Sequence, residues 1–248
     1  MTRRYAIIGD PVSHSLSPVM QNAAFRAAGL DATYEAIRVE AAGIASAVAS
    51  LKQSHLGFNV TTPLKESVLS HIDAMTSAAA AVRAVNAVRV DRGKTTGHNT
   101  DGVGLVAAIF DIWHVTPHGM SVCILGSGPA GRAIANAFTG SSVARLTCWS
   151  RNVKTSAEIG PLPDSAPDML VSALPPGVRV PPEILAMVAP APYLFDINYA
   201  RGAPVVPPEI GKHRSDGLPM LLHQGAIAFE WWTSVPAPLR EMRAAIGL

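Results

Sequence analysis

The sequence predicts an α/β fold in two domains, and three observations lead to that prediction. The chain has 248 residues, which fits one large α/β domain or two smaller ones, because domains usually contain roughly 100–200 residues. Short apolar runs typical of strands alternate with helical stretches, an order that indicates a mostly parallel sheet covered on both faces. A glycine-rich loop near the middle of the chain starts a second set of such elements.

The first set of elements lies in the first hundred residues. We expect strands at the apolar runs 5–8, 33–39, 57–61 and 85–90, and helices at 18–28, 42–51 and 64–71. Pro18 suits the first position of a helix because the N–H that it lacks has no partner there, and Ser17 precedes it as the cap.

The second set begins with a strand at 122–125 and a helix at 130–138. Further strands are expected at 146–149, 169–173 and 193–197, then a helix at 221–232 and a short final helix. The proline-rich segments 161–167, 175–182 and 204–208 are expected to be loops inside the second domain.

The composition excludes several classes of protein. Hydrophobic residues make up 48% of the chain and charged residues 15%, so a sizeable core is available and disorder is not expected. The net charge is +2 without a basic block, which argues against a nucleic-acid partner. No apolar run approaches the length of a membrane span, which needs about 18 residues. The two cysteines lie in short apolar runs, which indicates reduced, buried thiols and a cytoplasmic enzyme.

A dinucleotide-binding fingerprint, G-x-G-x-x-G, is formed by Gly126, Ser127, Gly128, Pro129, Ala130 and Gly131. It leaves an apolar strand and opens a helical stretch, which is the context that the fingerprint requires. The first glycine allows a tight turn, the second lets the backbone approach a pyrophosphate, and the third lets helix and strand pack closely. An ordinary glycine-rich turn is the alternative.

The end of the next strand distinguishes between nicotinamide cofactors. An NAD site has an acidic residue about 20 residues after the fingerprint, for the ribose 2′-hydroxyl. Here Arg151 and Lys154 follow the strand, and no acid comes before Glu158. A guanidinium suits a 2′-phosphate, so the pattern favours NADP over a solvent-facing basic turn.

Polar groups also follow the strands of the first domain, in the segments 9–18, 59–65, 86 and 99–102. Ligands of α/β sheets bind at strand ends, so we expect these groups to converge on one crevice. Hydroxyls, amides, one lysine and one aspartate suit a small polyhydroxylated acid. No His, Cys and Asp set has metal-ligand spacing, and no Ser/His pair resembles a nucleophile elbow.

These motifs closely resemble those of the shikimate dehydrogenase family. The resemblance covers nearly the whole chain, in the order GDPVSHSLSP, GFNVTTPLK, AVNAV, GHNTDGVG, GSGPAG and DGLPMLLHQGAIAFEWW. It implies a substrate-binding and catalytic domain in residues 1–101, joined by the C-terminal helices 221–248, and a Rossmann-type NADP-binding domain in residues 102–220. A deep cleft between the two domains is part of that expectation.

By this resemblance, the chain oxidises the ring 3-hydroxyl of shikimate reversibly to 3-dehydroshikimate with NADP, as a monomer or homodimer without a metal. The family's catalytic pair corresponds to Lys65 and Asp101. Its substrate-binding positions correspond to Ser15, Ser17, Asn59, Thr61, Asn86, Thr100, Tyr199 and Gln224. Its cofactor positions correspond to the loop 126–131, Ser150, Arg151, Ile197 and Gly217, and Lys154 adds a second charge.

The chemistry of that reaction explains the pair. Hydride delivery to a ketone builds negative charge on oxygen, so a proton donor must lie within hydrogen-bond reach. Lys65 can donate that proton, and Asp101 can bind the same hydroxyl or hold the ammonium in place.

Some positions differ from the usual pattern of the family. Gln21 replaces a common histidine, the sequence Ser-Arg-Asn at 150–152 replaces Asn-Arg-Thr, and Pro219 stands where glycine is common. They leave open a quinate or quinate/shikimate dehydrogenase that uses NAD. A protein of another class, which senses shikimate without turnover, is a further alternative, although a sensor needs neither Lys65 nor Asp101.

Overall fold

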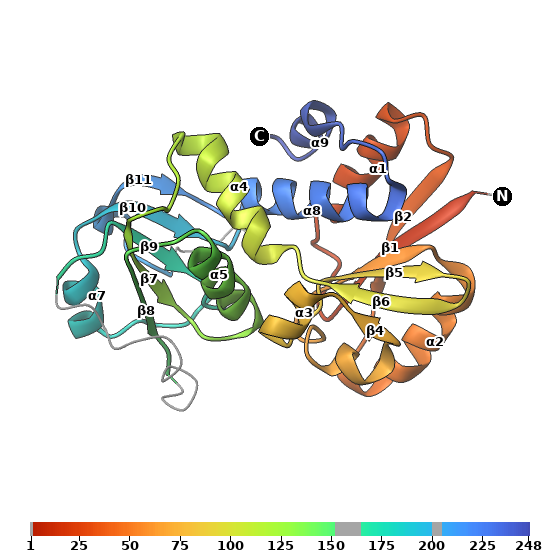
Figure 1. Cartoon of the computed structure of the whole chain (residues 1–248), viewed down its shortest axis with the longest axis horizontal. Helices are drawn as coiled ribbons and strands as arrows, with labels where there is room; N and C mark the ends of the chain where they lie inside the picture. The colour runs from red at the N-terminus through yellow and green to blue at the C-terminus, as the bar shows by residue number, and fades with distance from the viewer. Residues whose placement is uncertain (1, 152–164, 200–204) are drawn as a thin grey trace. The chain divides into compact units, whose positions relative to one another are not determined.

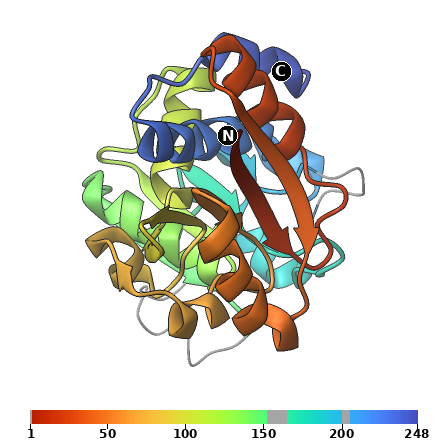
Figure 2. The ribbon, with the colours of Figure 1, turned by 90° about the vertical axis from the view of Figure 1, so that its right-hand side faces the viewer.

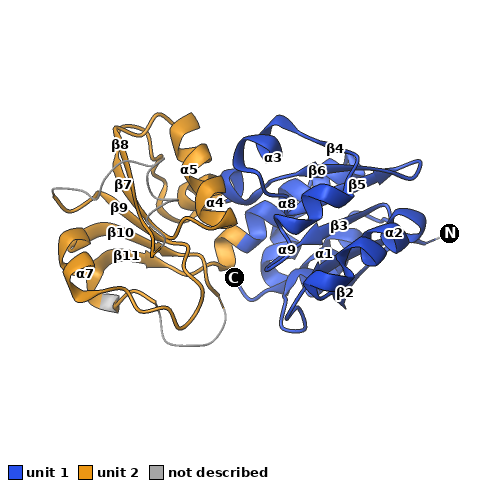
Figure 3. Ribbon diagram, turned by 90° about the horizontal axis from the view of Figure 1, so that it is seen from below, with its two compact units in different colours: residues 1–104, 221–248 blue, residues 105–220 orange. Residues whose placement is uncertain are grey.

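The computed structural model describes residues 2–151, 165–199 and 205–248, whose helices and strands are labelled in Figure 1. The chain divides into two compact units, coloured separately in Figure 3. Unit 1 contains residues 1–104 and 221–248, and unit 2 contains residues 105–220. The chain leaves unit 1 within helix α4 (Asp101–Trp113) and returns within helix α8 (Leu218–Thr233).

Unit 1 contains a mixed sheet in the order β2-β1-β3-β5-β6-β4. Its strands are β1 (Arg3–Gly9), β2 (Ala32–Arg38), β3 (Gly57–Val60), β4 (Ala74–Met75), β5 (Ala87–Asp91) and β6 (Lys94–His98). The predicted parallel pairing is confirmed for β1 with β2 and β3. Strand β5 departs from the mostly parallel arrangement, because it is antiparallel to both β3 and β6.

A tight hairpin explains the antiparallel strands. Asp91 pairs with Lys94, and the two residues between them, Arg92 and Gly93, have φ angles of 49° and 75°. Two successive positive φ angles are typical of the turn that best joins twisted antiparallel strands. Strand β6 escaped prediction because its sequence, KTTGH, lacks apolar alternation.

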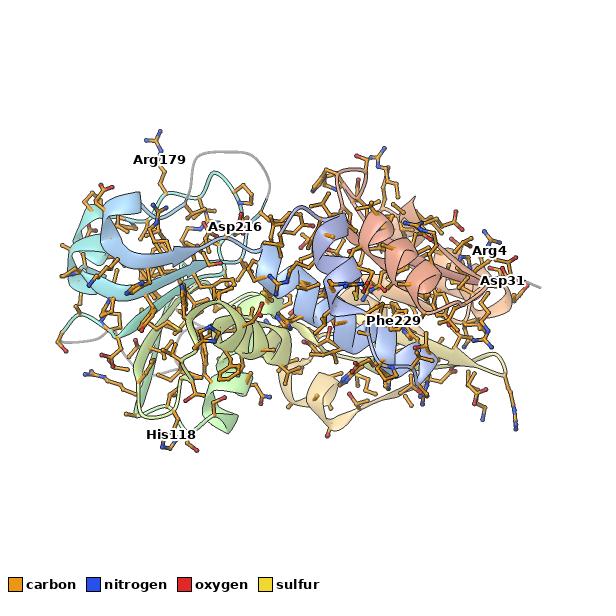
Figure 4. The ribbon with its side chains drawn as sticks, turned by 90° about the horizontal axis from the view of Figure 1, so that it is seen from above. Arg4, Asp31, His118, Arg179, Asp216 and Phe229 are labelled. Carbon is orange, nitrogen blue, oxygen red and sulfur yellow. The ribbon has the colours of Figure 1, made fainter. Side chains whose placement is uncertain are left out.

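Helices cover both faces of this sheet (Figure 2). On one face, α1 (Ser17–Ala27) and α8 surround the ring of Tyr5, which lies 5.0 Å from the ring of Phe25 and 5.3 Å from that of Trp232. The α8 residue Phe229, labelled in Figure 4, is fully buried there, and α9 (Leu239–Ala245) packs beside α1. On the other face, Phe58 packs in a core that includes residues of α2 (Ile44–Ser54).

The helix predicted at 64–71 is wrong. A turn is followed by the short 3-10 helix η2 (Ser67–His71), and Leu64 and Val68 are the fully buried residues of this segment. One short turn is enough to bury two residues four positions apart, and no longer apolar stripe calls for an α-helix. The remaining short helices of unit 1 are η1 (Ala41–Gly43) and α3 (Ser77–Val82).

Unit 2 contains a sheet in the order β11-β10-β9-β7-β8, and its neighbouring strands pair in parallel. The strands are β7 (Ser121–Leu125), β8 (Arg145–Trp149), β9 (Met169–Ser172), β10 (Ala191–Asp196) and β11 (Gly211–Ser215). Besides the part of α4 that belongs to this unit, the helices in its described residues are α5 (Pro129–Gly140), α7 (Pro182–Val188) and η3 (Pro208–Ile210). Strand β11 was not predicted, because its exposed sequence GKHRS carries no apolar run.

The strand order of unit 2 reverses at β7. The strand that follows it in sequence, β8, lies on one side, and β9 lies on the other. Ligands of open parallel sheets bind outside the strand ends at such a switch point. The loop that follows β7 is the glycine-rich fingerprint, so the fold puts this loop where an α/β sheet binds its ligand.

Candidate active site

Lys65 and Asp101 form an ion pair in unit 1. Lys65 comes shortly after β3, and Asp101 is the first residue of α4. The Lys65 Nζ atom lies 2.7 Å from Oδ2 of Asp101, and the two side chains are 15% and 6% exposed. The pair is therefore largely shielded from water, and the Lys65 side chain is the more exposed of the two.

The second carboxylate oxygen of Asp101 is also engaged. Asn86 donates from Nδ2 to Oδ1 of Asp101 at 2.7 Å, and the same amide nitrogen lies 2.9 Å from the hydroxyl oxygen of Thr100. In return, the backbone N–H of Thr100 donates to Oδ1 of Asn86 at 2.8 Å. Both oxygens of the carboxylate thus have a donor, which fixes its orientation toward Lys65.

Gln224 approaches this group from α8. Its Oε1 atom lies 3.4 Å from Nδ2 of Asn86 and 3.5 Å from the hydroxyl oxygen of Thr100. The close approach of α4 and α8 depends on Gly104, because a Cβ atom there would lie 2.6 Å from Cβ and 2.7 Å from the backbone nitrogen of Gln224.

Asn59 is held in one amide orientation by two neighbours. Its Nδ2 atom donates to the backbone oxygen of Asn86 at 2.8 Å, and its Oδ1 atom accepts from the hydroxyl of Tyr34 at 2.6 Å. A carbonyl oxygen only accepts, so Nδ2 must face Asn86 and Oδ1 must face Tyr34. Tyr34 was not among the predicted residues. A tyrosine in an expected buried strand needs a partner for its hydroxyl, but sequence does not identify that partner.

Ser15, Ser17 and Thr61 lie in the segments that follow β1 and β3, which are parallel neighbours. The hydroxyl oxygen of Ser15 accepts from the backbone N–H of Ser17, the first residue of α1, at 3.2 Å. The two segments touch at Gly9, where a Cβ atom would overlap Cγ2 of Thr61. Tyr199 follows β10 in unit 2 and is therefore in a different unit from the other predicted substrate residues.

The fingerprint loop of unit 2 has the geometry that its glycines indicate. Gly126 has a φ angle of 112°, and a Cβ atom on Gly131 would overlap the carbonyl oxygen of Gly126. Gly128 precedes α5, whose first residue is Pro129. This arrangement leaves the N-terminus of a twelve-residue helix open to an anion such as a pyrophosphate.

The loop is joined to the end of β8, where the cofactor was predicted to be selected. The hydroxyl of Ser127 donates to that of Ser150 at 2.8 Å, and Arg151 follows with an exposed side chain. Lys154 lies outside the described residues. Ile197 and Gly217, also predicted at the cofactor site, are adjacent, because a Cβ atom on Gly217 would overlap the carbonyl oxygen of Ile197.

Burial shifts the pKa of His98, Cys123 and Cys148. Burial lowers the pKa of His98, whose Nδ1 atom lies 2.8 Å from the hydroxyl oxygen of Thr76. Burial raises the pKa of Cys123 to about 11 and that of Cys148 to about 12. Both cysteines are free and buried, as predicted, and neither thiol is ionised enough near neutral pH to act as a nucleophile.

Across residues 2–151, 165–199 and 205–248, no group of three or more His, Cys, Asp or Glu residues is arranged to hold a metal ion. Within the same ranges, no helix combines the length and the apolarity needed to cross a membrane.

Family models of known proteins match two segments of the chain. The family model of the shikimate dehydrogenase substrate binding domain matches residues 7–88, and that of the shikimate 5'-dehydrogenase C-terminal domain matches residues 217–246. The chain is 34% identical to shikimate dehydrogenase (NADP(+)) of Magnetococcus marinus, over 95% of this chain and 93% of that protein. It is 35% identical to shikimate dehydrogenase (NADP(+)) of Methanothrix thermoacetophila, over 98% and 96%.

Solved structures show the same fold. The crystal structure of shikimate 5-dehydrogenase from Thermus thermophilus in complex with NADP(H) and shikimate is similar to this chain with a TM-score of 0.88. The two chains are 28% identical, and the similarity covers 98% of each.

Proposed function

This chain belongs to the shikimate dehydrogenase family, and we propose on that basis that it catalyses the NADP-dependent, reversible reduction of 3-dehydroshikimate to shikimate. The observation that carries this proposal is the Lys65–Asp101 pair, whose side chains are 2.7 Å apart and largely buried. A protein that only sensed shikimate would have no need of such a proton donor.

Unit 1 holds the substrate in this proposal. The hydroxyls of Ser15 and Ser17 bind the planar ring carboxylate, and Thr61 and Asn86 meet the ring hydroxyls. Asn59, Thr100 and Gln224 complete the polar surroundings, and Tyr199 contributes from its own unit. Support comes from the hydrogen bonds that already join Asn86 to Thr100 and Asn59, because fixed polar groups lose little entropy when a ligand binds.

Lys65 supplies the proton. In the reductive direction its ammonium donates a proton to the carbonyl oxygen of 3-dehydroshikimate, while NADPH, when bound, supplies the hydride to the carbonyl carbon. The neutral amine then regains a proton from solvent. Asp101 holds Nζ at its Oδ2 atom, so the donor stays oriented while charge develops on the substrate oxygen.

Unit 2 holds NADP in this proposal. The loop 126–131 accepts the pyrophosphate, since Gly126 and Gly131 leave no room for a side chain where backbone and helix meet. Ser150 and Arg151 face the 2′-phosphate, with Lys154 as a second charge, and Ile197 and Gly217 line the cofactor. We propose cytoplasmic action, which fits the two reduced, buried thiols.

The test is nicotinamide absorbance on the purified protein, with shikimate and quinate each combined with NADP and with NAD. We expect the highest kcat/KM with shikimate and NADP, and poor activity with quinate, whose extra hydroxyl and puckered ring need additional room and an additional partner. Equal efficiency with quinate and NAD contradicts the proposal. Binding of shikimate, measured by calorimetry, without turnover of any pair would indicate the sensor instead.

A further inference from the structure

Asn99 has no role in the function proposed above. It lies two residues before Asp101 and is buried, with 5% of its surface exposed. We infer that Asn99 is a positioning residue, which fixes the backbone of Asp101 relative to that of Lys65. This inference rests on the proposed function, because it assumes that Lys65 and Asp101 act together on the substrate.

The side-chain amide of Asn99 is used at both ends. Its Oδ1 atom accepts from the backbone N–H of Asp101 at 3.1 Å. Its Nδ2 atom donates to the backbone oxygen of Ala84 at 3.0 Å. One end therefore holds the first residue of α4, and the other end holds the segment that leads to Asn86.

The Ala84 segment is in turn bound to Lys65. The backbone N–H of Val85 donates to the backbone oxygen of Lys65 at 2.9 Å. Three hydrogen bonds and the peptide bond between Ala84 and Val85 thus lead from the backbone of Lys65, through Asn99, to the backbone of Asp101. The ion pair between Lys65 Nζ and Asp101 Oδ2, at 2.7 Å, closes this path into a ring.

The ring explains why the two charged groups meet at a defined place. An ion pair alone leaves the backbones of its two residues free to move, because the lysine side chain is long and flexible. The side chain of Asn99 is short and buried, so its hydrogen bond to the backbone N–H of Asp101 holds that backbone in place. Misplacement of a reacting group by about 1 Å can lower turnover by about 100-fold, so we expect loss of the Asn99 side chain to slow proton transfer.

The decisive experiment is a double-mutant cycle of Asn99→Ala and Asp101→Ala. In the wild-type background we expect Asn99→Ala to lower kcat for shikimate by about 10- to 100-fold, with the KM for NADP within about 2-fold of its original value. In the Asp101→Ala background, measured at high enzyme concentration, we expect the same change to lower kcat by less than about 3-fold, because no carboxylate remains to be positioned.

Thr95→Val is the matched control. Thr95 is fully buried in unit 1, and its hydroxyl accepts from the backbone N–H of Asp73 and donates to Oδ2 of Asp73. This variant also removes a side chain that bridges two segments, but it leaves the ring intact. It should lower the unfolding temperature as Asn99→Ala does, and keep kcat within about 2-fold of wild type.

Two results would overturn the inference. One is a folded Asn99→Ala protein with kcat within about 3-fold of wild type, and the other is an equal fold-loss in both backgrounds. If Asn99→Ala does not fold, Asn99→Ser decides by the same criteria, since serine can still cap Asp101 but cannot reach Ala84. If Lys65→Ala turns over at the wild-type rate, the proposed mechanism fails as well. If Lys65→Ala loses activity but the Asn99 variants keep the wild-type kcat, the proposed mechanism stands and only the inference about Asn99 is wrong.

Discussion

The contact between α4 and α8 makes Gly104→Ala an informative substitution. The added Cβ atom would lie 2.6 Å from Cβ, 2.7 Å from the nitrogen and 2.8 Å from Cα of Gln224, whereas ordinary contact begins at 3.4 Å. Gln224 must therefore move by about 0.6–0.8 Å, the difference between those distances. Backbone atoms are among the neighbours, so a simple rotamer change cannot relieve the overlap.

Both stability and substrate binding should respond. Overpacking of this kind destabilises by about 1–3 kcal/mol, even though alanine is intrinsically better than glycine in a helix by about 0.8–1 kcal/mol. The contacts of Gln224 with Asn86 and Thr100, at 3.4 and 3.5 Å, are already long and would be lost. Loss of one substrate hydrogen bond is worth about 0.5–1.5 kcal/mol, so the KM for shikimate should rise about 2- to 12-fold.

Urea unfolding and initial-rate kinetics measure the two effects. Gly43→Ala is the control, because Gly43 has a φ angle of −93° and a Cβ atom there would meet nothing within 4 Å. This control should be as stable and as active as the wild type. A Gly104→Ala protein with unchanged stability and an unchanged KM for shikimate would refute the reasoning, because the overlap would then have been absorbed without moving Gln224.

Four further outcomes are expected. Lys65→Ala should lower turnover by about 10²–10⁴, the range for a lost general acid, with an unchanged circular dichroism spectrum; near wild-type turnover would contradict its role. Arg151→Ala should raise the KM for NADP far more than that for NAD, since a charge-assisted phosphate contact is worth about 1.5–3 kcal/mol; equal changes would argue against a phosphate contact. Burial lowers the pKa of His98, so below about pH 6.5 the unfolded chain binds a proton that the folded chain excludes, and the free energy of unfolding should fall as pH falls. Urea titrations at several pH values below about 6.5 should show a smaller fall in the free energy of unfolding for His98→Gln than for the wild type. An equal fall in both proteins would exclude His98 as a cause of the pH dependence. Because burial raises the pKa of both thiols, a thiol reagent should label the two cysteines slowly in the folded protein and rapidly in urea.

Much of the fold could be predicted, because apolar runs and glycine loops are local signals. Strands β1 and β7 were predicted from apolar runs, and helix α5 was predicted after the glycine-rich loop. Three strands escaped prediction, β4, β6 and β11, and all lie at or near a sheet edge. Strand β4 has only two residues, and β6 and β11 carry polar sequences, KTTGH and GKHRS. Their place in the sheet depends on backbone pairing, which leaves no periodic apolar pattern in the sequence.

The candidate site was predictable to the extent that its residues follow strands. Lys65 and Asp101 were named from the resemblance, and the structure brings them together at 2.7 Å. Tyr34 was not among the predicted residues, and Asn99 was expected only as one of the polar groups of the crevice. The partners that the structure gives them are Asn59 and the backbone oxygen of Ala84, which lie far from them along the chain. Such contacts depend on tertiary geometry, which no spacing in one sequence reveals.

The two-part construction of unit 1 has a consequence for how the protein is made. The ribosome synthesises residues 1–104 before unit 2, but residues 221–248, which complete unit 1, only after it. Until then the ring of Tyr5 lacks Trp232, with its centroid 5.3 Å away in the finished protein, and Asn86 lacks Gln224. Unit 2 is one contiguous segment, so all of it is synthesised before residues 221–248. Until residues 221–248 are synthesised, the N-terminal sheet therefore has an uncovered apolar face, which is the kind of surface that chaperones bind. A product truncated before residue 221 would lack Gln224 and with it part of the site.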